Sequence, residues 1–283
     1  MYVGILTAPF GDTPLEHVAA FAGEYGFGGL EIITGPGSKH IDTNSFDGTA
    51  AKSVLALMEK RNLQISALAG FADVTHADPT RRAANINTVR RAIEIAKMLD
   101  VKVITTLAGL PPNGKDRFKT IEEDCVEVFP ALLDYAAKHD VKLACENWYA
   151  TNIQHLGHWD RLFELVPHPN FGLNFDPSHL YWQGIDHIAA IEKYASRIFH
   201  CHAKDTEVLD AKLKVVGNQG DGWWRYVIPG LGRIHWGQHI ATLRRCGYNG
   251  ALSIEHEDGA IGREEGFLVG KKNLELYFEP GMS

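Results

Sequence analysis

The chain has 283 residues, of which 45% are hydrophobic and 22% are charged, and its formal net charge is −7. This composition is typical of a folded globular protein and excludes a disordered or fibrous one. The 28 Lys and Arg residues are scattered among 35 Asp and Glu residues. Since nucleic-acid binding normally needs a basic stripe along the phosphate backbone, we expect no nucleic-acid partner.

Cysteine usage and the distribution of apolar residues predict a cytoplasmic protein. The four cysteines, Cys125, Cys145, Cys201 and Cys246, form no CxxC pair and no disulfide framework. The N-terminal residues lack the basic start and apolar length of a signal peptide. No apolar run approaches the ~18 residues that cross a bilayer, so we expect no membrane partner.

Short apolar runs alternate with longer segments of helical period along the whole chain. In segment 81–99, for example, apolar residues recur at roughly helical spacing. The predicted strands are 3–7, 29–33, 65–69, 103–107, 142–145, 171–175, 198–202 and 251–254. Alternation of this kind indicates parallel βαβ units and an α/β fold.

Local signals predict where helices begin and end. Thr13, Pro14 and Glu16 have the form of a capping box with proline at the first helical position. A joint in which Gly, Asn or Asp ends a helix and an apolar residue follows recurs at Gly26-Phe27, Asn62-Leu63, Asp100-Val101, Asp140-Val141 and Gly247-Tyr248. These joints form a weak internal repeat.

Eight βα units predict a single (β/α)8 TIM barrel that comprises residues 1–283, with the active site at the C-terminal ends of the strands. An open doubly wound sheet is the alternative, but no Gly-rich dinucleotide motif follows the first strand. One segment interrupts the rhythm: residues 206–234 are predicted to form a long loop over the active-site face, with the next helix beginning near His235. Within this loop, Trp223, Trp224 and Arg225 could stack on a sugar ring and bind its oxygens.

Acidic and histidine side chains stand at the ends of the last four predicted strands. They are Glu146, Asp176, His202 and Glu255. One such carboxylate alone is equally well explained by a hydrogen bond across the barrel mouth. Three converging carboxylates would repel one another without a cation, so the set predicts a site for one divalent metal ion. Oxygen and nitrogen ligands suit Mn²⁺, Mg²⁺ or Co²⁺.

His200 and His202 lie on the same face of their strand, so periodicity excludes neither as a ligand. We assign His202 because it is nearer the strand end, which leaves His200 as a core or supporting residue. Trp148 could wall the pocket, and His256 is close enough in the chain to reach it.

The set Glu146, Asp176 with His179 three residues later, His202 and Glu255 resembles the xylose isomerase-like TIM barrel superfamily, specifically its sugar phosphate isomerase/epimerase group. The resemblance covers the full chain as eight βα units. It implies that Glu146, Asp176, His202 and Glu255 hold one divalent metal, often Mn²⁺, with Mg²⁺, Co²⁺ and Zn²⁺ as alternatives. It also implies that His179 contacts a substrate oxygen.

The same resemblance implies an isomerase or epimerase of a sugar, sugar phosphate or polyol. Glu146 and Glu255 would exchange a proton next to a carbonyl through a cis-enediolate, which Lewis-acid charge stabilisation favours. Whether copies of the chain associate into a homo-oligomer stays open.

The chain departs from the ketose 3-epimerases of the family after the ligand histidine, where it has Ala203, Lys204 and Asp205 and a longer loop. These residues look more like members associated with inositol or oxidised-sugar catabolism, some of which eliminate across 3-keto-glycosides. A lyase or hydratase acting on a 3-keto-sugar or keto-inositol is therefore the alternative function. Lys204 could bind a carboxylate, phosphate or carbonyl oxygen, or pair with Asp205.

Two further alternatives are less well supported. Endonuclease IV resembles this barrel, but the additional histidines of its three-zinc cluster are missing here. A non-catalytic sugar-binding subunit would not need the intact four-residue ligand set.

Overall fold

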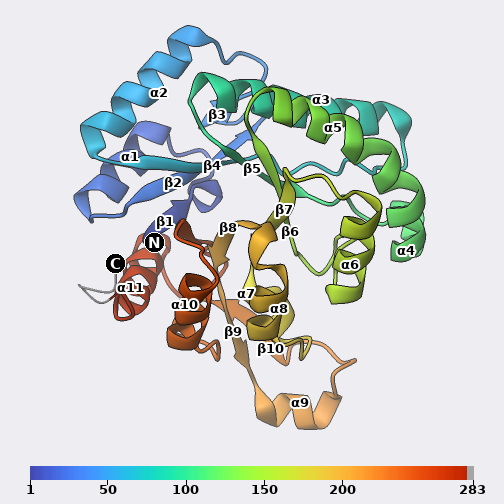
Figure 1. Ribbon diagram of the computed structural model, residues 1–283. Helices are drawn as coiled ribbons and strands as arrows, with labels where there is room; N and C mark the ends of the chain where they lie inside the picture. Colours follow the sequence, from blue (N-terminus) through green and yellow to red (C-terminus); the bar gives the residue numbers. More distant parts are fainter. Residues whose placement is uncertain (279–283) are drawn as a thin grey trace.

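The computed structural model of the protein describes residues 1–278 and contains a closed barrel of parallel strands (Figure 1). The barrel strands are β1 (Tyr2–Leu6), β2 (Gly29–Gly35), β4 (Gln64–Ala69), β5 (Val103–Leu107), β6 (Lys142–Glu146), β7 (Phe171–Phe175), β8 (Ile198–Ala203) and β11 (Ala251–Ile254). Each pairs in parallel with its neighbour in chain order, and β1 pairs with both β2 and β11, which closes the ring. The predicted (β/α)8 barrel is confirmed, and every predicted strand end lies within two residues of the observed one.

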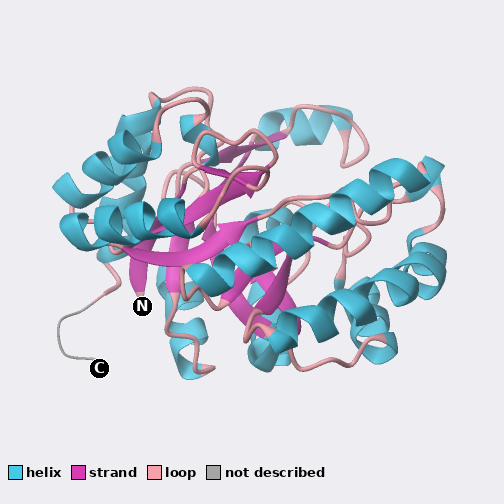
Figure 2. Cartoon of the chain, turned by 90° about the horizontal axis from the view of Figure 1, so that it is seen from above, coloured by secondary structure: helices cyan, strands magenta, loops and turns pink. Residues whose placement is uncertain are grey.

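Helices surround the strands on the outside of the barrel, as the view from above shows (Figure 2). They are α1 (Leu15–Glu24), α2 (Gly48–Arg61), α3 (Pro79–Met98), α4 (Arg117–Thr120), α5 (Val126–Lys138), α6 (Leu156–Leu165), α7 (Pro177–Tyr181), α8 (His187–Tyr194), α10 (Trp236–Arg245) and α11 (Arg263–Glu275). One π-helical turn, η3 (Ile121–Cys125), joins α4 to α5, and short 3₁₀ turns lie at 8–10, 112–114 and 195–197. Among residues 1–278, no helix is both long and apolar enough to cross a membrane.

The five predicted helix-to-strand joints share one geometry. Each joint residue has a left-handed backbone, with φ of 68° at Gly26, 53° at Asn62, 54° at Asp100, 59° at Asp140 and 87° at Gly247. In every joint the next residue donates its N–H to a carbonyl five positions earlier, at 2.8 to 3.0 Å. These are the bonds of the Schellman motif, so the weak repeat in the sequence reflects a recurring helix C-cap.

The predicted capping box before α1 does not form. The helix begins at Leu15, and Pro14 is its N-cap residue, with no side-chain hydrogen bond to the first turn. Pro14 has an extended ψ of 144°, so the helix starts one residue later than predicted. The Thr13 carbonyl instead lies 2.9 Å from Nε2 of His40.

The segment predicted as a long loop contains secondary structure of its own. Strands β9 (Asp205–Val208) and β10 (Trp224–Val227) pair antiparallel and form a two-stranded ribbon, and α9 (Asp210–Val216) lies between them. Figure 1 shows this ribbon and α9 extending away from the barrel. Helix α10 begins at Trp236, next to the predicted start at His235. The sequence also gave no sign of the two-residue strand β3 (Ile41–Asp42).

A neutral histidine lies in the packing between α10 and the barrel. The ring of His239 is fully buried among the rings of Phe175, His187 and Trp236. Neither ring nitrogen has a hydrogen-bond partner among the described residues. Burial, with a smaller contribution from His187, lowers the pKa of His239 from 6.5 to about 3.

This depressed pKa predicts acid sensitivity of the fold. Below pH 6.5 the unfolded chain binds a proton at His239 that the folded chain does not bind until about pH 3, so the free energy of unfolding falls as the pH falls. Between pH 7 and pH 5 we expect the free energy of unfolding of His239→Phe to fall by about 2 kcal/mol less than that of the wild type. Urea denaturation at the two pH values measures this difference. The exposed His17 provides the control variant His17→Gln. Parallel stability curves for His239→Phe and wild type would contradict the assignment.

Candidate metal and active site

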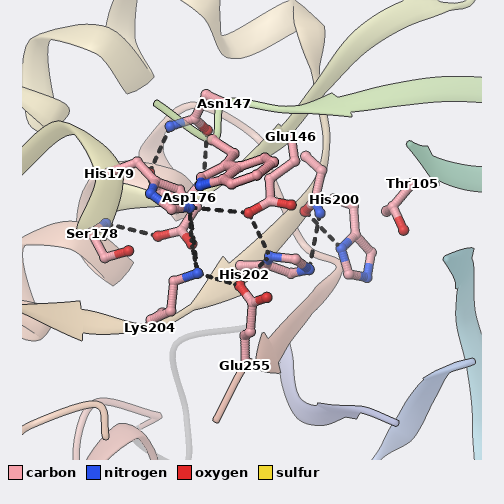
Figure 3. A network of polar contacts seen from close by, with 12 residues as sticks. Thr105, Glu146, Asn147, Asp176, Ser178, His179, His200, His202, Lys204 and Glu255 are labelled. Carbon is pink, nitrogen blue, oxygen red and sulfur yellow. Dashed lines mark hydrogen bonds and ion pairs between the residues drawn. The ribbon is translucent and has the colours of Figure 1, made fainter. Parts of the chain in front are cut away.

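Four side chains converge at the C-terminal end of the barrel (Figure 3). They are Glu146 at the end of β6, Asp176 after β7, His202 on β8 and Glu255 after β11. One ligand atom from each lies within 4.8 Å of one from every other. All four are buried or nearly so, and Glu255 is the most exposed at 12% of its side chain. Adjacent parallel strands thus bring together the four residues that the sequence selects as metal ligands.

Two atoms of this cluster are suited to bind a cation. Nδ1 of His202 lies 3.1 Å from Glu255 and 3.7 Å from Glu146, and Oδ2 of Asp176 faces the same space. Both atoms are buried and face groups of opposite charge, because Nδ1 of His202 faces two glutamates and Oδ2 of Asp176 lies 3.2 Å from the ammonium of Lys204. The three carboxylates repel one another in this buried space, and a divalent ion would neutralise them more fully than the single charge of Lys204 does. Three carboxylates and one imidazole therefore fit a metal ion at this position.

A fifth residue, Glu31 on β2, supports His202 from below. Its Oε2 lies 3.0 Å from Nε2 of His202, and its Oε1 accepts a hydrogen bond of 2.5 Å from Thr105. Burial alone would raise the pKa of Glu31, but the charge of His202 and these hydrogen bonds lower it to about 2. The ionised carboxylate accepts the Nε2–H of His202, so Nδ1 is the ring nitrogen that faces the cluster and would bind a metal once its proton is displaced.

Glu31 was not predicted as a site residue, although the sequence contains a signal for it. Glu31 is the one charged residue in the predicted strand 29–33, and a carboxylate in the middle of a buried strand needs a partner. The sequence alone does not identify this partner, because it lies on β8, far from Glu31 along the chain.

His200 lies below the four-residue cluster. Its Nδ1 is 3.0 Å from Oδ1 of Asn174, and its Nε2 is 3.2 Å from Oγ of Ser66. Burial lowers the pKa of His200 to about 4, so the ring is neutral. Since both nitrogens have partners, His200 contributes to the packing around Glu31 instead of facing the cluster.

Lys204 brings a positive charge into the acidic cluster. Its side chain is 1% exposed, and Nζ lies 2.6 Å from Oε2 of Glu255, 3.2 Å from Oδ2 of Asp176 and 3.3 Å from Nε2 of His179. Burial opposes its charge, but the nearby carboxylates outweigh burial and raise the pKa of Lys204 well above its ordinary value. Lys204 therefore does not pair with the neighbouring Asp205, which points away.

His179 connects the cluster to its surroundings. Its Nε2 lies 3.1 Å from Oε1 of Glu146. Burial alone would raise the pKa of Glu146, but hydrogen bonds from His179 and His202 hold it well below its ordinary range. Glu146 is thus an ionised carboxylate with a donor beside it.

The cluster opens into a cavity of about 210 Å³. It is lined by Phe71, Leu107, Glu146, Trp148, His179, Lys204, Glu255 and Glu257. Trp148, His179 and Lys204, all predicted to bind substrate, are therefore at the cavity.

Two other predicted substrate-binding residues do not line this cavity. Arg225 pairs with Glu207 and Asp258, at 2.6 Å each, and its side chain is 44% exposed. His256 packs against Phe267, with Nε2 3.4 Å from the carbonyl of Gly262.

The contact between Glu31 and His202 generates a test of the cluster. We expect Glu31→Gln to weaken Mn²⁺ binding about 10- to 100-fold, because the amide no longer holds the Nε2–H of His202 as a carboxylate does. Isothermal titration calorimetry measures the affinity. The exposed Glu264 provides the control Glu264→Gln, which should bind Mn²⁺ as wild type does. Equal affinity of Glu31→Gln and wild type would remove Glu31 from this role.

Comparisons with known proteins agree with this fold. Residues 19–275 match the family described as xylose isomerase-like TIM barrel. YfiH of Bacillus subtilis, described as uncharacterized, is 28% identical to this chain over 97% of the chain and 98% of YfiH. The crystal structure of IolI with a bound zinc atom superposes with a TM-score of 0.78 at 21% identity, covering 99% of this chain and 100% of IolI.

Two relatives with named activities match part of the chain. An inosose isomerase of Halalkalibacterium halodurans is 29% identical over 60% of this chain, which spans 58% of that relative. An inosose dehydratase of Geobacillus thermodenitrificans is 30% identical over 46% of this chain, which spans 45% of that relative. With the family match extending over most of its length, the chain belongs to the xylose isomerase-like TIM barrel family.

Proposed function

We propose that this protein is a divalent-metal-dependent isomerase or epimerase of a sugar or polyol, which transfers a proton at a carbon next to a carbonyl. The observation that carries the proposal is the convergence of three carboxylates and Nδ1 of His202 at one barrel mouth. The inosose isomerase and inosose dehydratase among the relatives support an enzyme acting on a keto-polyol.

Glu146, Asp176, His202 and Glu255 are the residues that would hold the metal. Three oxygen donors and one nitrogen suit Mn²⁺, and Mg²⁺, Co²⁺ or Zn²⁺ could use the same donors. The zinc atom in the IolI structure supports a divalent ion in a protein of this fold. When bound, the metal supplies Lewis-acid polarisation of the substrate carbonyl and the neighbouring hydroxyl.

Glu146 and Glu255 would act as the acid and base pair. Glu146 is ionised, so it can accept a proton, and the Nε2 of His179 steadies its Oε1 at 3.1 Å. Glu255 accepts a hydrogen bond of 2.6 Å from the ammonium group of Lys204. Two carboxylates that flank one small cavity can remove a proton from one face of a carbon and return it to the same or the other face.

The composition of the cavity supports an uncharged substrate. Among the described residues that line it, Lys204 is the single lysine or arginine, and its Nζ already contacts Glu255 and Asp176. A phosphate would meet Glu146, Glu255 and Glu257 without a free lysine or arginine to bind it. Phe71 and Trp148 offer flat apolar surfaces on which the C–H face of a sugar or cyclitol ring can stack.

Lys204 gives one specific reason to keep a lyase as the second candidate. Its ammonium group lies 2.6 Å from Glu255, on the same side of the cavity. If Glu146 removed the proton next to the carbonyl, Lys204 could donate a proton to a departing hydroxyl, and water would leave. Loss of 18 mass units from the product distinguishes this reaction from isomerisation.

The acid and base roles predict complete loss of proton exchange in two variants. With Mn²⁺ in D₂O, the wild type should incorporate deuterium next to the carbonyl of a free ketose or a keto-inositol, as measured by NMR. Glu146→Gln and Glu255→Gln should each lose exchange by about 10²-fold or more, because an amide cannot accept the proton. Unchanged circular dichroism and thermal unfolding verify that both variants are folded. Exchange retained in both variants would exclude these residues as the acid and base.

The charge of the cavity predicts selection against phosphorylated substrates. We expect deuterium exchange into a ketose phosphate to be at least about tenfold slower than into the matching free ketose, since the lining carboxylates repel a dianion. The same NMR assay at equal concentrations compares the two. Faster exchange into the phosphorylated sugar would overturn the inference about charge while leaving the proton-transfer function in place.

A further inference from the structure

Tyr226 reaches the candidate site from outside the barrel. It lies on β10 of the ribbon, and its hydroxyl oxygen is 2.6 Å from Nδ1 of His179. The two rings are nearly perpendicular, with an interplanar angle of 84°. The ammonium of Lys204 lies over the Tyr226 ring, 4.6 Å from its centre. Tyr226 thus contacts two residues of the site although it belongs to none of the eight strands.

Alternation along β10 explains which ribbon residues face the site. Neighbouring residues on a strand point to opposite sides, so Trp224 and Tyr226 share one face and Arg225 takes the other. The Trp224 ring stacks on the Trp182 ring with 4.3 Å between ring centres, and its centre lies 5.0 Å from that of the Tyr226 ring. The inward face of the ribbon is therefore aromatic, and its outward face carries the ion pairs of Arg225.

One buried carboxylate fixes the base of the ribbon. Asp205 accepts hydrogen bonds of 2.7 to 3.0 Å from the backbone N–H groups of Thr206, Gly230 and Ile234 and from the indole of Trp236. Thr206 in turn donates to the carbonyl of Ser178, the residue before His179, at 3.1 Å. The ribbon is thus attached directly to the short helix that carries His179.

Close packing at this base requires a residue without a side chain. A Cβ atom added at Gly232 would lie 2.3 Å from Oδ1 of Asp205 and 2.5 Å from the carbonyl oxygen of Thr206. Both contacts are far too short, so Gly232 permits the turn to close over Asp205. The position of Tyr226 is consequently set by fixed backbone contacts.

The contact between Tyr226 and His179 has a defined proton arrangement. Nε2 of His179 faces the carboxylate oxygens of Glu146 at 3.1 Å and Asp176 at 3.5 Å, which can only accept, so the phenol of Tyr226 is placed to donate to Nδ1 at 2.6 Å. A neutral imidazole that accepts at Nδ1 carries its own proton on Nε2, which is the atom 3.1 Å from Glu146.

We propose that Tyr226 is a positioning residue that holds His179 in the tautomer with its proton on Nε2, directed at Glu146. Without the phenol, the proton of His179 can move to Nδ1, and two acceptors then face each other at Nε2 and Oε1. The consequence for catalysis rests on the proposed acid and base role of Glu146. The tautomer itself does not depend on that role.

Long-range ¹H–¹⁵N NMR of the full chain, labelled at histidine and loaded with Mg²⁺, tests the tautomer. The His179 signals are assigned by their loss in His179→Gln. In the wild type we expect an unprotonated Nδ1 and a protonated Nε2, whereas Tyr226→Phe should show a protonated Nδ1 or an averaged spectrum. Tyr181→Phe, the same change at the end of the helix that carries His179, should match the wild type. A protonated Nδ1 in the wild type, or an unchanged tautomer in Tyr226→Phe, would overturn the proposal.

Deuterium exchange separates this proposal from the proposed function. With Mn²⁺ and a free ketose or keto-inositol, Tyr226→Phe should exchange about tenfold or more slowly than wild type, and Tyr181→Phe should not differ from wild type. Equal exchange rates in the wild type and Tyr226→Phe would show that the His179 tautomer does not affect the proton transfer. If the wild type shows the expected tautomer but exchanges no substrate, the function fails and the arrangement of Tyr226 stands.

Discussion

Closure of the barrel brings negatively charged side chains together, and the residues around them compensate these charges. Glu146, Asp176 and Glu255 are each placed by a different strand end, yet their oxygens lie within 4.8 Å of one another. In a buried environment such carboxylates repel strongly unless cations or donors compensate them. Lys204, His179 and His202 supply part of that compensation, and a divalent ion would supply the rest.

His202 joins two buried layers of the barrel. One ring nitrogen faces the carboxylates at the mouth, and the other contacts Glu31 one layer below, where Thr105 and His200 complete the contacts. A rigid imidazole between two acidic groups keeps both at fixed positions. The ligand arrangement at the mouth therefore depends on a strand, β2, that contributes no ligand to the four-residue cluster.

Residues near in sequence and regular in pattern were predictable, and those that depend on distant contacts were not. The strands, the five helix C-caps and the set Glu146, Asp176, His202 and Glu255 follow from apolar runs and from what ends them. Glu31 was missed because its partner comes from β8. Tyr226 was missed because segment 206–234 lacks the apolar alternation of a barrel strand, and without the strand β10 the opposite orientations of Tyr226 and Arg225 could not be inferred. Pro14 shows that a local motif also fails, because the four-residue pattern does not determine the extended ψ of Pro14.

Attachment of the ribbon through one carboxylate makes the segment exchangeable. Four hydrogen bonds at its base end on Asp205, at the point where the chain leaves β8, and the chain returns at α10 beside Trp236. The barrel register is set elsewhere, by the strands and by the C-caps at the opposite end. Replacing residues between these two points with the corresponding segment of another family member would alter the aromatic wall while preserving the scaffold, which makes the ribbon a natural unit for redesigning substrate preference.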